Sequence, residues 1–186
     1  MTREAYHKAL KELENELLTL GEMVAKAVKD SMEALKKRDF EMSKEIVKND
    51  LLINKKRFEI EEKCLQLIAT QQPMAIDLRT IAAILSIITD LERIGDHAEG
   101  NAKINLLIGS EPLVKPLIDV PRMNEKGLSM LERVLKAFIS RDAKTARAIC
   151  DEDDEVDALY DQIYRELLLL MIENPKKIEG ATYLIW

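Results

Sequence analysis

The chain contains few of the residues that interrupt helices or build small cross-linked domains. Its 186 residues include 6 glycines, 5 prolines and 2 cysteines, and only 4% are aromatic. So few glycines and prolines leave room for long uninterrupted helices. Two cysteines cannot form the framework of a disulfide-rich secreted domain, and we expect Cys64 and Cys150 to be small core residues.

Other absences exclude whole classes of function. The formal net charge is −6, and no basic block is present to neutralise phosphates, so we expect no nucleic-acid partner. The apolar runs at residues 81–88 and 167–172 are too short to span a bilayer, and the N-terminus lacks the apolar core of a signal peptide. No Gly-x-Ser-x-Gly, Cys–His pairing or P-loop indicates nucleophilic catalysis. The sequence therefore predicts a soluble, cytoplasmic protein without membrane insertion.

Apolar residues recur at helical spacing along most of the chain. In the first segment the spacing is mainly three and four, at Leu10, Leu13, Leu17, Leu20, Val24, Ala27 and Val28. The pattern predicts helices over about residues 3–37, 40–70, 76–108, 120–139 and 143–172, with a sixth beginning at Tyr183. Asp39 and Asp142 are placed to cap the second and fifth helices, and Asp119-Val120-Pro121 to cap the fourth. No strand-like alternation is found, so the sequence predicts an all-α fold.

One three-helix unit is used twice. Lys37-Arg38-Asp39 and Ser140-Arg141-Asp142 occupy equivalent places, and both second helices end in a polar pair before a proline, Pro73 or Pro175. The sequence thus predicts two tandem antiparallel three-helix bundles. The expected domains are residues 1–108, a linker at 109–118 that carries a glycine and two prolines, and residues 119–186. The last helix stops inside its apolar stretch at Trp186, so we expect the native protein to continue, and the second bundle here to be incomplete.

The most informative segment is Asp90-Leu91-Glu92-Arg93-Ile94-Gly95-Asp96-His97-Ala98-Glu99, which follows a mostly apolar run. On a helix, Glu92, Asp96 and Glu99 fall within an arc of about 60°. Carboxylates crowded together repel one another, and a cation relieves that repulsion. The segment is therefore a candidate metal site at the edge of a packed core, in which His97 is either a ligand or a salt-bridge partner. His7 follows Glu4 by three residues but stands at a fraying terminus, so it is discounted.

The second helix of each unit carries matching polar pairs. Asp50 and Asn54 are four residues apart, as are Asp153 and Asp157. Like charges at this spacing destabilise a helix by roughly a few tenths of a kcal/mol, and a bound cation would reverse the sign. Carboxylate and amide oxygens without thiolates suit Mg²⁺, Mn²⁺, Ca²⁺ or iron, and favour Zn²⁺ less. The alternative is a solvated acidic face paired to lysine and arginine.

The acidic segment, together with the duplicated unit, resembles the PhoU family of phosphate-transport accessory and regulatory proteins. The ending Ala181-Thr182-Tyr183-Leu184-Ile185-Trp186 is similar to the second repeat of that family, and the opening, an aromatic-His pair before a Leu-rich helix, is similar too. The resemblance implies two bundles related by a pseudo-twofold axis. It also implies multinuclear metal sites built from Glu/Asp-x-x-x-Asp pairs.

These pairs fit Glu92 with Asp96 and Asp153 with Asp157, while Asn54 replaces the second acid of the pair that begins at Asp50. The resemblance associates the sites with iron, zinc, magnesium or manganese. If the second acidic motif of the family, expected after Trp186, is absent, the second site lacks the ligands on that side. Asp153 and Asp157 should then coordinate a metal ion poorly.

The resemblance also implies a role. The family acts in negative control of the phosphate-starvation response, linking the phosphate ABC transporter to its sensor histidine kinase, as a cytoplasmic homodimer and not as an enzyme. Two other readings of the residues remain: a carboxylate-bridged metalloenzyme of the helical-bundle type, with ligands converging inside a bundle and an open coordination position, and a metal-free helical scaffold.

Overall fold

The computed structural model describes residues 3–185, which are helical almost throughout and contain no strand. The elements in chain order are α1 (Arg3–Lys37), α2 (Phe40–Gln71), α3 (Ala75–Ile108), α4 (Asp119–Ser140), α5 (Ala143–Asp151), α6 (Asp153–Glu173), a 3₁₀ turn η1 (Pro175–Lys177) and α7 (Ile178–Ile185). The predicted all-α fold is confirmed.

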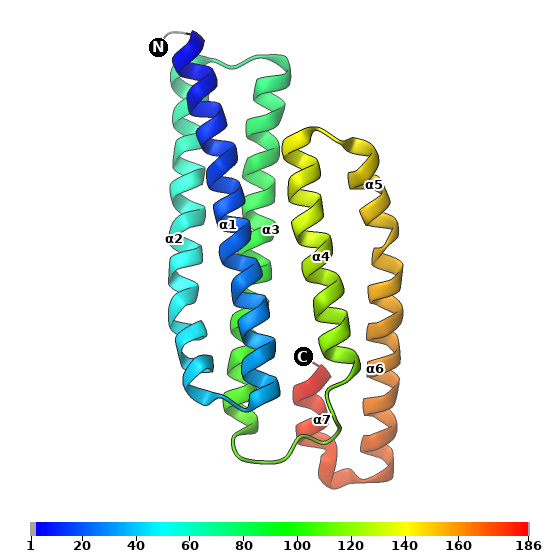
Figure 1. Cartoon of the computed structure of the whole chain (residues 1–186). Helices are drawn as coiled ribbons and strands as arrows, with labels where there is room; N and C mark the ends of the chain where they lie inside the picture. Colours follow the sequence, from blue (N-terminus) through cyan, green and yellow to red (C-terminus); the bar gives the residue numbers. More distant parts are fainter. Residues whose placement is uncertain (1–2, 186) are drawn as a thin grey trace.

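Helices α1, α2 and α3 form a long antiparallel bundle (Figure 1). Each helix turns one apolar stripe inward, because residues three and four apart share a face. The side chains at the centre are almost fully buried: Leu13, Leu17, Leu20, Val24, Ile60, Cys64, Ile81, Ile84, Ile88 and Leu91. Burying an aliphatic side chain of this size contributes roughly 1.5–3 kcal/mol, so this core supplies most of the stability of the bundle.

The second group of helices, α4 to α7, packs beside α1 through α4 (Figure 1). Its own core is small and centres on Ile163, Leu167 and Ala181. Leu135 of α4 instead joins the core of the first bundle, where it lies against Gly21 of α1. The absence of a side chain at Gly21 gives Leu135 the space to approach.

Two of the three predicted caps are confirmed. Asp39 Oδ1 accepts a hydrogen bond from Met42 N at 2.9 Å, and Asp142 Oδ1 accepts one from Thr145 N at 3.0 Å. The prediction for Asp119 is wrong. A capping residue precedes the first residue of its helix, whereas Asp119 is itself the first residue of α4. Ile118 holds the capping position without a side-chain hydrogen bond, and Asp119 lies in the first turn, where its charge still favours the helix dipole.

Two helix boundaries in the second unit differ from the prediction. The fifth helix is interrupted at Glu152, whose amide bonds to the carbonyl of Ile149 and whose carboxylate pairs with Arg133. The last helix begins at Ile178 and not at Tyr183, because the side chain of Asn174 accepts a hydrogen bond from Lys176 N and restarts helical structure directly after the proline. Trp186, expected in that helix, lies outside the described residues.

Only one of the two cysteines is in the core. Cys64 is fully buried between the helices of the first bundle, where burial raises the pKa of its thiol to about 12. Cys150 is exposed, so the prediction for it is wrong. It follows Ile149, the one buried residue of the short helix α5, and therefore points away from the core.

The helices of residues 3–185 include none that combines the length and the apolar character needed to cross a membrane.

Candidate metal centre

Asp50 of α2 lies directly against Gly95 of α3. A Cβ atom at position 95 would lie 3.2 Å from Ile53 Cγ2 and 3.8 Å from Asp50 Oδ1. The missing side chain therefore lets α2 approach α3 closely at this level. As a result, the Asp50 carboxylate sits beside the acidic segment of α3.

Asp50 and Asn54 present two oxygen atoms that lack donors. Asn54 Nδ2 donates to Asp50 Oδ2 at 2.8 Å, which fixes both side chains. The second carboxylate oxygen of Asp50, Oδ1, and the amide oxygen of Asn54, Oδ1, are buried and have no hydrogen-bond partner among residues 3–185. Buried acceptors without partners are uncommon and cost roughly 1–3 kcal/mol each. These two atoms are one helical turn apart and suit a hard cation.

The electrostatics of Asp50 show which acids surround it. Burial raises the pKa of Asp50 first, and the charges of Glu99 and Asp96 raise it further, against the opposing effects of the hydrogen bond from Asn54 and the charge of Lys103. The charges of two α3 carboxylates thus reach Asp50 on α2, and a cation beside Asp50 would relieve this repulsion.

Asp90, Glu92 and Glu99 of the segment have cationic partners on the protein. Glu99 pairs with Lys103 at 2.6 Å, and Glu92 lies 3.5 Å from Arg57. Arg57 also pairs with Glu61 at 2.7 Å. In the part of the chain that the structure describes, no three His, Cys, Asp or Glu side chains converge closely enough to hold a metal ion.

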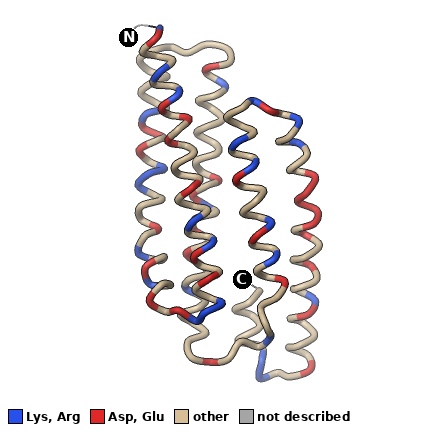
Figure 2. Tube along the Cα trace, viewed as in Figure 1, with Lys and Arg blue, Asp and Glu red and all other residues tan. Residues whose placement is uncertain are grey.

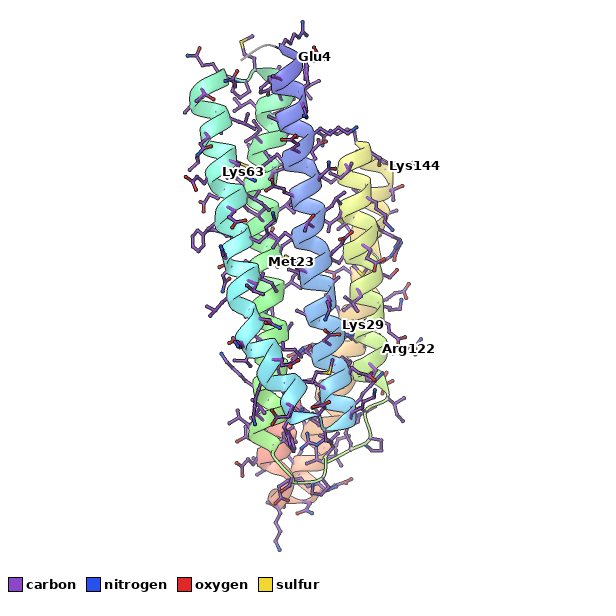
Figure 3. The ribbon with its side chains drawn as sticks, turned by 60° about the vertical axis from the view of Figure 1, so that its left-hand side comes forward. Glu4, Met23, Lys29, Lys63, Arg122 and Lys144 are labelled. Carbon is purple, nitrogen blue, oxygen red and sulfur yellow. The ribbon has the colours of Figure 1, made fainter. Side chains whose placement is uncertain are left out.

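A cavity of about 190 Å³ opens beside Asp50 and Glu99, between α1, α2 and α3. Its α1 wall carries Met23, marked in Figure 3, and the ion pair of Lys26 with Asp30. Asp50 and Glu99 thus line a partly open cavity between the three helices, and Asp96 and Glu92 are not among its lining residues. The metalloenzyme reading needs ligands that converge inside a bundle, and no three acids of the described chain converge in this way.

The candidates of the second unit are far more open. Asp153 and Asp157 are exposed at the start of α6, in the run of acidic residues that Figure 2 shows there, and neither forms an ion pair within residues 3–185. His97 lies on a different face of α3 from Asp96 and lines a groove of about 500 Å³ between the two bundles. The structure therefore joins Asp50 to Asn54 by a hydrogen bond and places Asp50 within the electrostatic influence of Glu99 and Asp96, while Asp153 and Asp157 lie exposed on α6.

Sequence reasoning missed the cations and the glycine of this site. Arg57 and Lys103 each stand four residues from an acid on the same helix, Glu61 and Glu99, and this spacing could have indicated them. The role of Gly95 depends on the distance between α2 and α3, which no local pattern gives.

Asp50→Asn should make the protein more stable at neutral pH when no metal is present. The folded-state pKa of Asp50 is raised, so the folded protein favours the protonated carboxyl and Asp50 contributes most stability below its unfolded pKa. That contribution is lost as the pH rises through the folded-state pKa. The amide avoids this loss, and we expect the melting temperature to rise by about 2–4 °C at pH 7. Thermal melts between pH 3 and pH 8 would measure it. The gain should vanish in acid and be absent for Asp90→Asn, an exposed acid on α3.

Comparison with known proteins gives a consistent result along the chain. The PhoU domain matches residues 17–104 and 120–186. A relative from Clostridium acetobutylicum, described as a phosphate-specific transport system accessory protein PhoU homolog, is 40% identical over an alignment of 187 positions that covers 100% of this chain and 85% of that protein. A protein of the same description from Aquifex aeolicus is 36% identical over 95% of this chain and 80% of its own length.

Solved structures agree. The crystal structure of the phosphate transport system regulatory protein PhoU from Streptococcus pneumoniae has a TM-score of 0.90 at 32% identity, covering 97% of this chain and 84% of that one. The crystal structure of PhoU from Pseudomonas aeruginosa has a TM-score of 0.92 at 31% identity, covering 97% and 87%. The matches place one family segment on α1 to α3 and one on α4 to α7, so the chain belongs to the PhoU domain family.

Proposed function

We propose that this protein is an accessory and regulatory component of phosphate transport that binds metal ions. In this role it would act in the cytoplasm as a homodimer without catalysis of its own. It would link the phosphate ABC transporter to a sensor histidine kinase and restrain the phosphate-starvation response. The printed names of its relatives support the transport role. The partners and the sign of control follow from the family resemblance.

The metal-binding part of the proposal is carried by one observation. Two buried oxygen atoms, Asp50 Oδ1 and Asn54 Oδ1, have no hydrogen-bond partner within residues 3–185. A cation there would satisfy both and offset the repulsion among Asp50, Asp96 and Glu99. Iron, Mn²⁺, Mg²⁺ and Zn²⁺ all accept such oxygen ligands, with the first three preferred.

Metal binding would compete with the ion pairs of the site. Glu99 can serve the cation only by leaving Lys103, and Glu92 only by leaving Arg57. Ion pairs on a protein surface contribute only about 0–1 kcal/mol, so a divalent cation can displace them. Asp153 and Asp157 would form the second, weaker site of the same kind.

The double variant Glu92→Gln with Asp96→Asn should lower the metal content at least tenfold while leaving the helicity intact. Removing two negative charges weakens the attraction for a cation, while both side chains keep their shape. Elemental analysis of protein purified without chelator, with circular dichroism of the same samples, gives both readouts. The matched control is Asp90→Asn on the same helix, which should retain the metal.

Two results would contradict this function. Loss of helicity in the double variant would mean that the two acids are structural. Wild-type protein without bound metal, and without a melting shift in Mn²⁺ or iron, would favour the metal-free scaffold.

A further inference from the structure

Three buried polar atoms of α2 lack hydrogen-bond partners within residues 3–185: Asp50 Oδ1, Asn54 Oδ1 and Arg57 Nε. At 3.6 residues per turn, positions 50, 54 and 57 fall within an arc of about 60°. This arc lies towards α3, which runs antiparallel beside α2 (Figure 1). The two oxygens are the acceptors that the proposed cation would satisfy. Arg57 Nε is a donor, so a cation does not satisfy it, and it needs an acceptor of its own.

Only one edge of the Arg57 guanidinium is hydrogen-bonded. Nη1 donates to Glu61 Oε2 at 2.7 Å, and the guanidinium carbon lies 4.6 Å from the ring centre of Phe58. The other edge, formed by Nε and Nη2, makes no hydrogen bond within residues 3–185. Two parallel N–H groups on such an edge match two oxygens of a carboxylate or a phosphate. The side chain is 17% exposed and Nε is buried, so bulk water does not replace the missing acceptor at Nε.

Glu92 of α3 lies near this edge but does not hydrogen-bond to it. Its Oε2 is 3.5 Å from Arg57 Nε, which is close enough for charge attraction, and Nε remains without a hydrogen-bond partner. In the metal-free protein Glu92 is therefore a loosely held counter-ion of Arg57. A metal ion that draws Glu92 to itself leaves the Nε–Nη2 edge free beside a cation.

Carboxylates outnumber cations on the facing sides of α2 and α3, so the metal-free site repels an anion. The acids are Asp50, Glu61, Glu92, Asp96 and Glu99, and the cations are Arg57 and Lys103. A bound metal ion reduces this excess of negative charge and can accept a further oxygen ligand. Binding of an anion at Arg57 should therefore depend on the metal.

We propose that the metal-loaded protein binds inorganic phosphate, shared between the metal ion and the Nε–Nη2 edge of Arg57. A tetrahedral oxyanion suits this position because two of its oxygens can accept the parallel N–H groups while a third remains for the metal. A carboxylate has only two oxygens and cannot do both in this way. The inference rests on the metal site of the proposed function and gives that site a ligand.

Equilibrium dialysis with radiolabelled inorganic phosphate tests the proposal on the wild-type protein. Protein loaded with Mn²⁺ should bind phosphate at least tenfold more tightly than protein treated with chelator, because only the metal overcomes the excess of negative charge. Coupling between two ligands is reciprocal, so phosphate should tighten Mn²⁺ binding by the same factor. Electron paramagnetic resonance of the free Mn²⁺ measures that second effect.

Two variants of Arg57 separate its edge from its charge. Arg57→Gln should weaken phosphate binding at least tenfold while the protein retains Mn²⁺, because Arg57 is not a metal ligand. Arg57→Lys keeps the charge beside Phe58 and loses only the paired N–H groups, and it should also weaken phosphate binding about tenfold. The matched control is Arg79→Gln, which removes an exposed arginine of α3 that forms no ion pair within residues 3–185 and should change neither measurement.

The possible failures are distinguishable. Mn²⁺ binding that phosphate does not affect would overturn this inference and leave the metal site standing. Wild-type phosphate affinity in Arg57→Gln and Arg57→Lys would show that the Nε–Nη2 edge is not the binding group. If O-phosphoserine displaced inorganic phosphate at equal concentration, the edge would belong to a phosphorylated partner and not to free phosphate. A wild type that binds no metal would overturn the metal site and this inference together.

Discussion

Asn105→Leu should lower the free energy of unfolding by about 3 kcal/mol, because several buried polar groups lose their partner at once. Asn105 is fully buried near the end of α3. Its Nδ2 lies 3.1 Å from Ala34 O and 2.9 Å from Ser43 Oγ, and its Oδ1 accepts from Arg38 Nη1 at 2.7 Å. One side chain thus joins the turn between α1 and α2 to α3.

Arg38 extends the same network to the linker. Its Nη2 donates to the carbonyl of Gly109 and to that of Glu111. Burial lowers the pKa of Arg38, so this charge depends on the hydrogen bonds that replace water. With leucine at position 105, the guanidinium of Arg38 would lose its hydrogen bond to Asn105 Oδ1 in the most buried part of the network.

Chemical denaturation monitored by circular dichroism measures the effect of Asn105→Leu. Asn15→Leu is the matched control, because Asn15 is exposed on α1, and it should change stability by less than about 0.5 kcal/mol. Equal stability of the two variants would show that the network contributes nothing beyond the shape of its residues.

Gly95→Leu should abolish the metal-dependent stabilisation and destabilise the protein by about 2 kcal/mol. Even a Cβ at this position meets Ile53 at 3.2 Å, so a leucine forces α2 away from α3, and overpacking of this kind typically costs about 1–3 kcal/mol. The displacement also separates Asp50 from Asp96 and Glu99. The melting shift produced by Mn²⁺ or iron should then disappear.

Gly100→Leu provides a control on the same helix. A Cβ at position 100 meets nothing within 4 Å, so only the better helix propensity of leucine counts, and stability should rise by up to about 1 kcal/mol. The metal response of this variant should match the wild type. If Gly95→Leu kept a full metal response, the close approach of α2 and α3 would not be needed for the site.

Local patterns in the sequence were enough to predict most helices. In the first bundle, the apolar spacing of α1 and the caps and breaks at Asp39 and Pro73 lie on contiguous segments, and the predicted ends agree with the structure within one or two residues. The helix boundaries of the second unit were harder to predict. The fifth helix is interrupted at Glu152, which pairs with Arg133 of another helix, and α7 starts early because the chain turns back into a helix after Asn174.

The residues of the candidate site could likewise be predicted from the sequence only in part. Helical spacing placed Glu92, Asp96 and Glu99 on one arc, but spacing carries no information on which residue of α2 each of them meets. The structure brings Asp96 and Glu99 towards Asp50 and gives Glu92 to Arg57. The metal site itself stays a prediction.

The sequence by itself determined that the chain is all-α, built from a repeated unit, with its acids gathered at the edge of an apolar stripe. Those properties follow from residue types and their spacing along one helix. Only the tertiary structure decided which acids lie near Asp50, that Glu92 pairs with Arg57 and that Cys150 is exposed. These depend on the distance and rotation between helices, which are set by packing at residues such as Gly95 and Ile53.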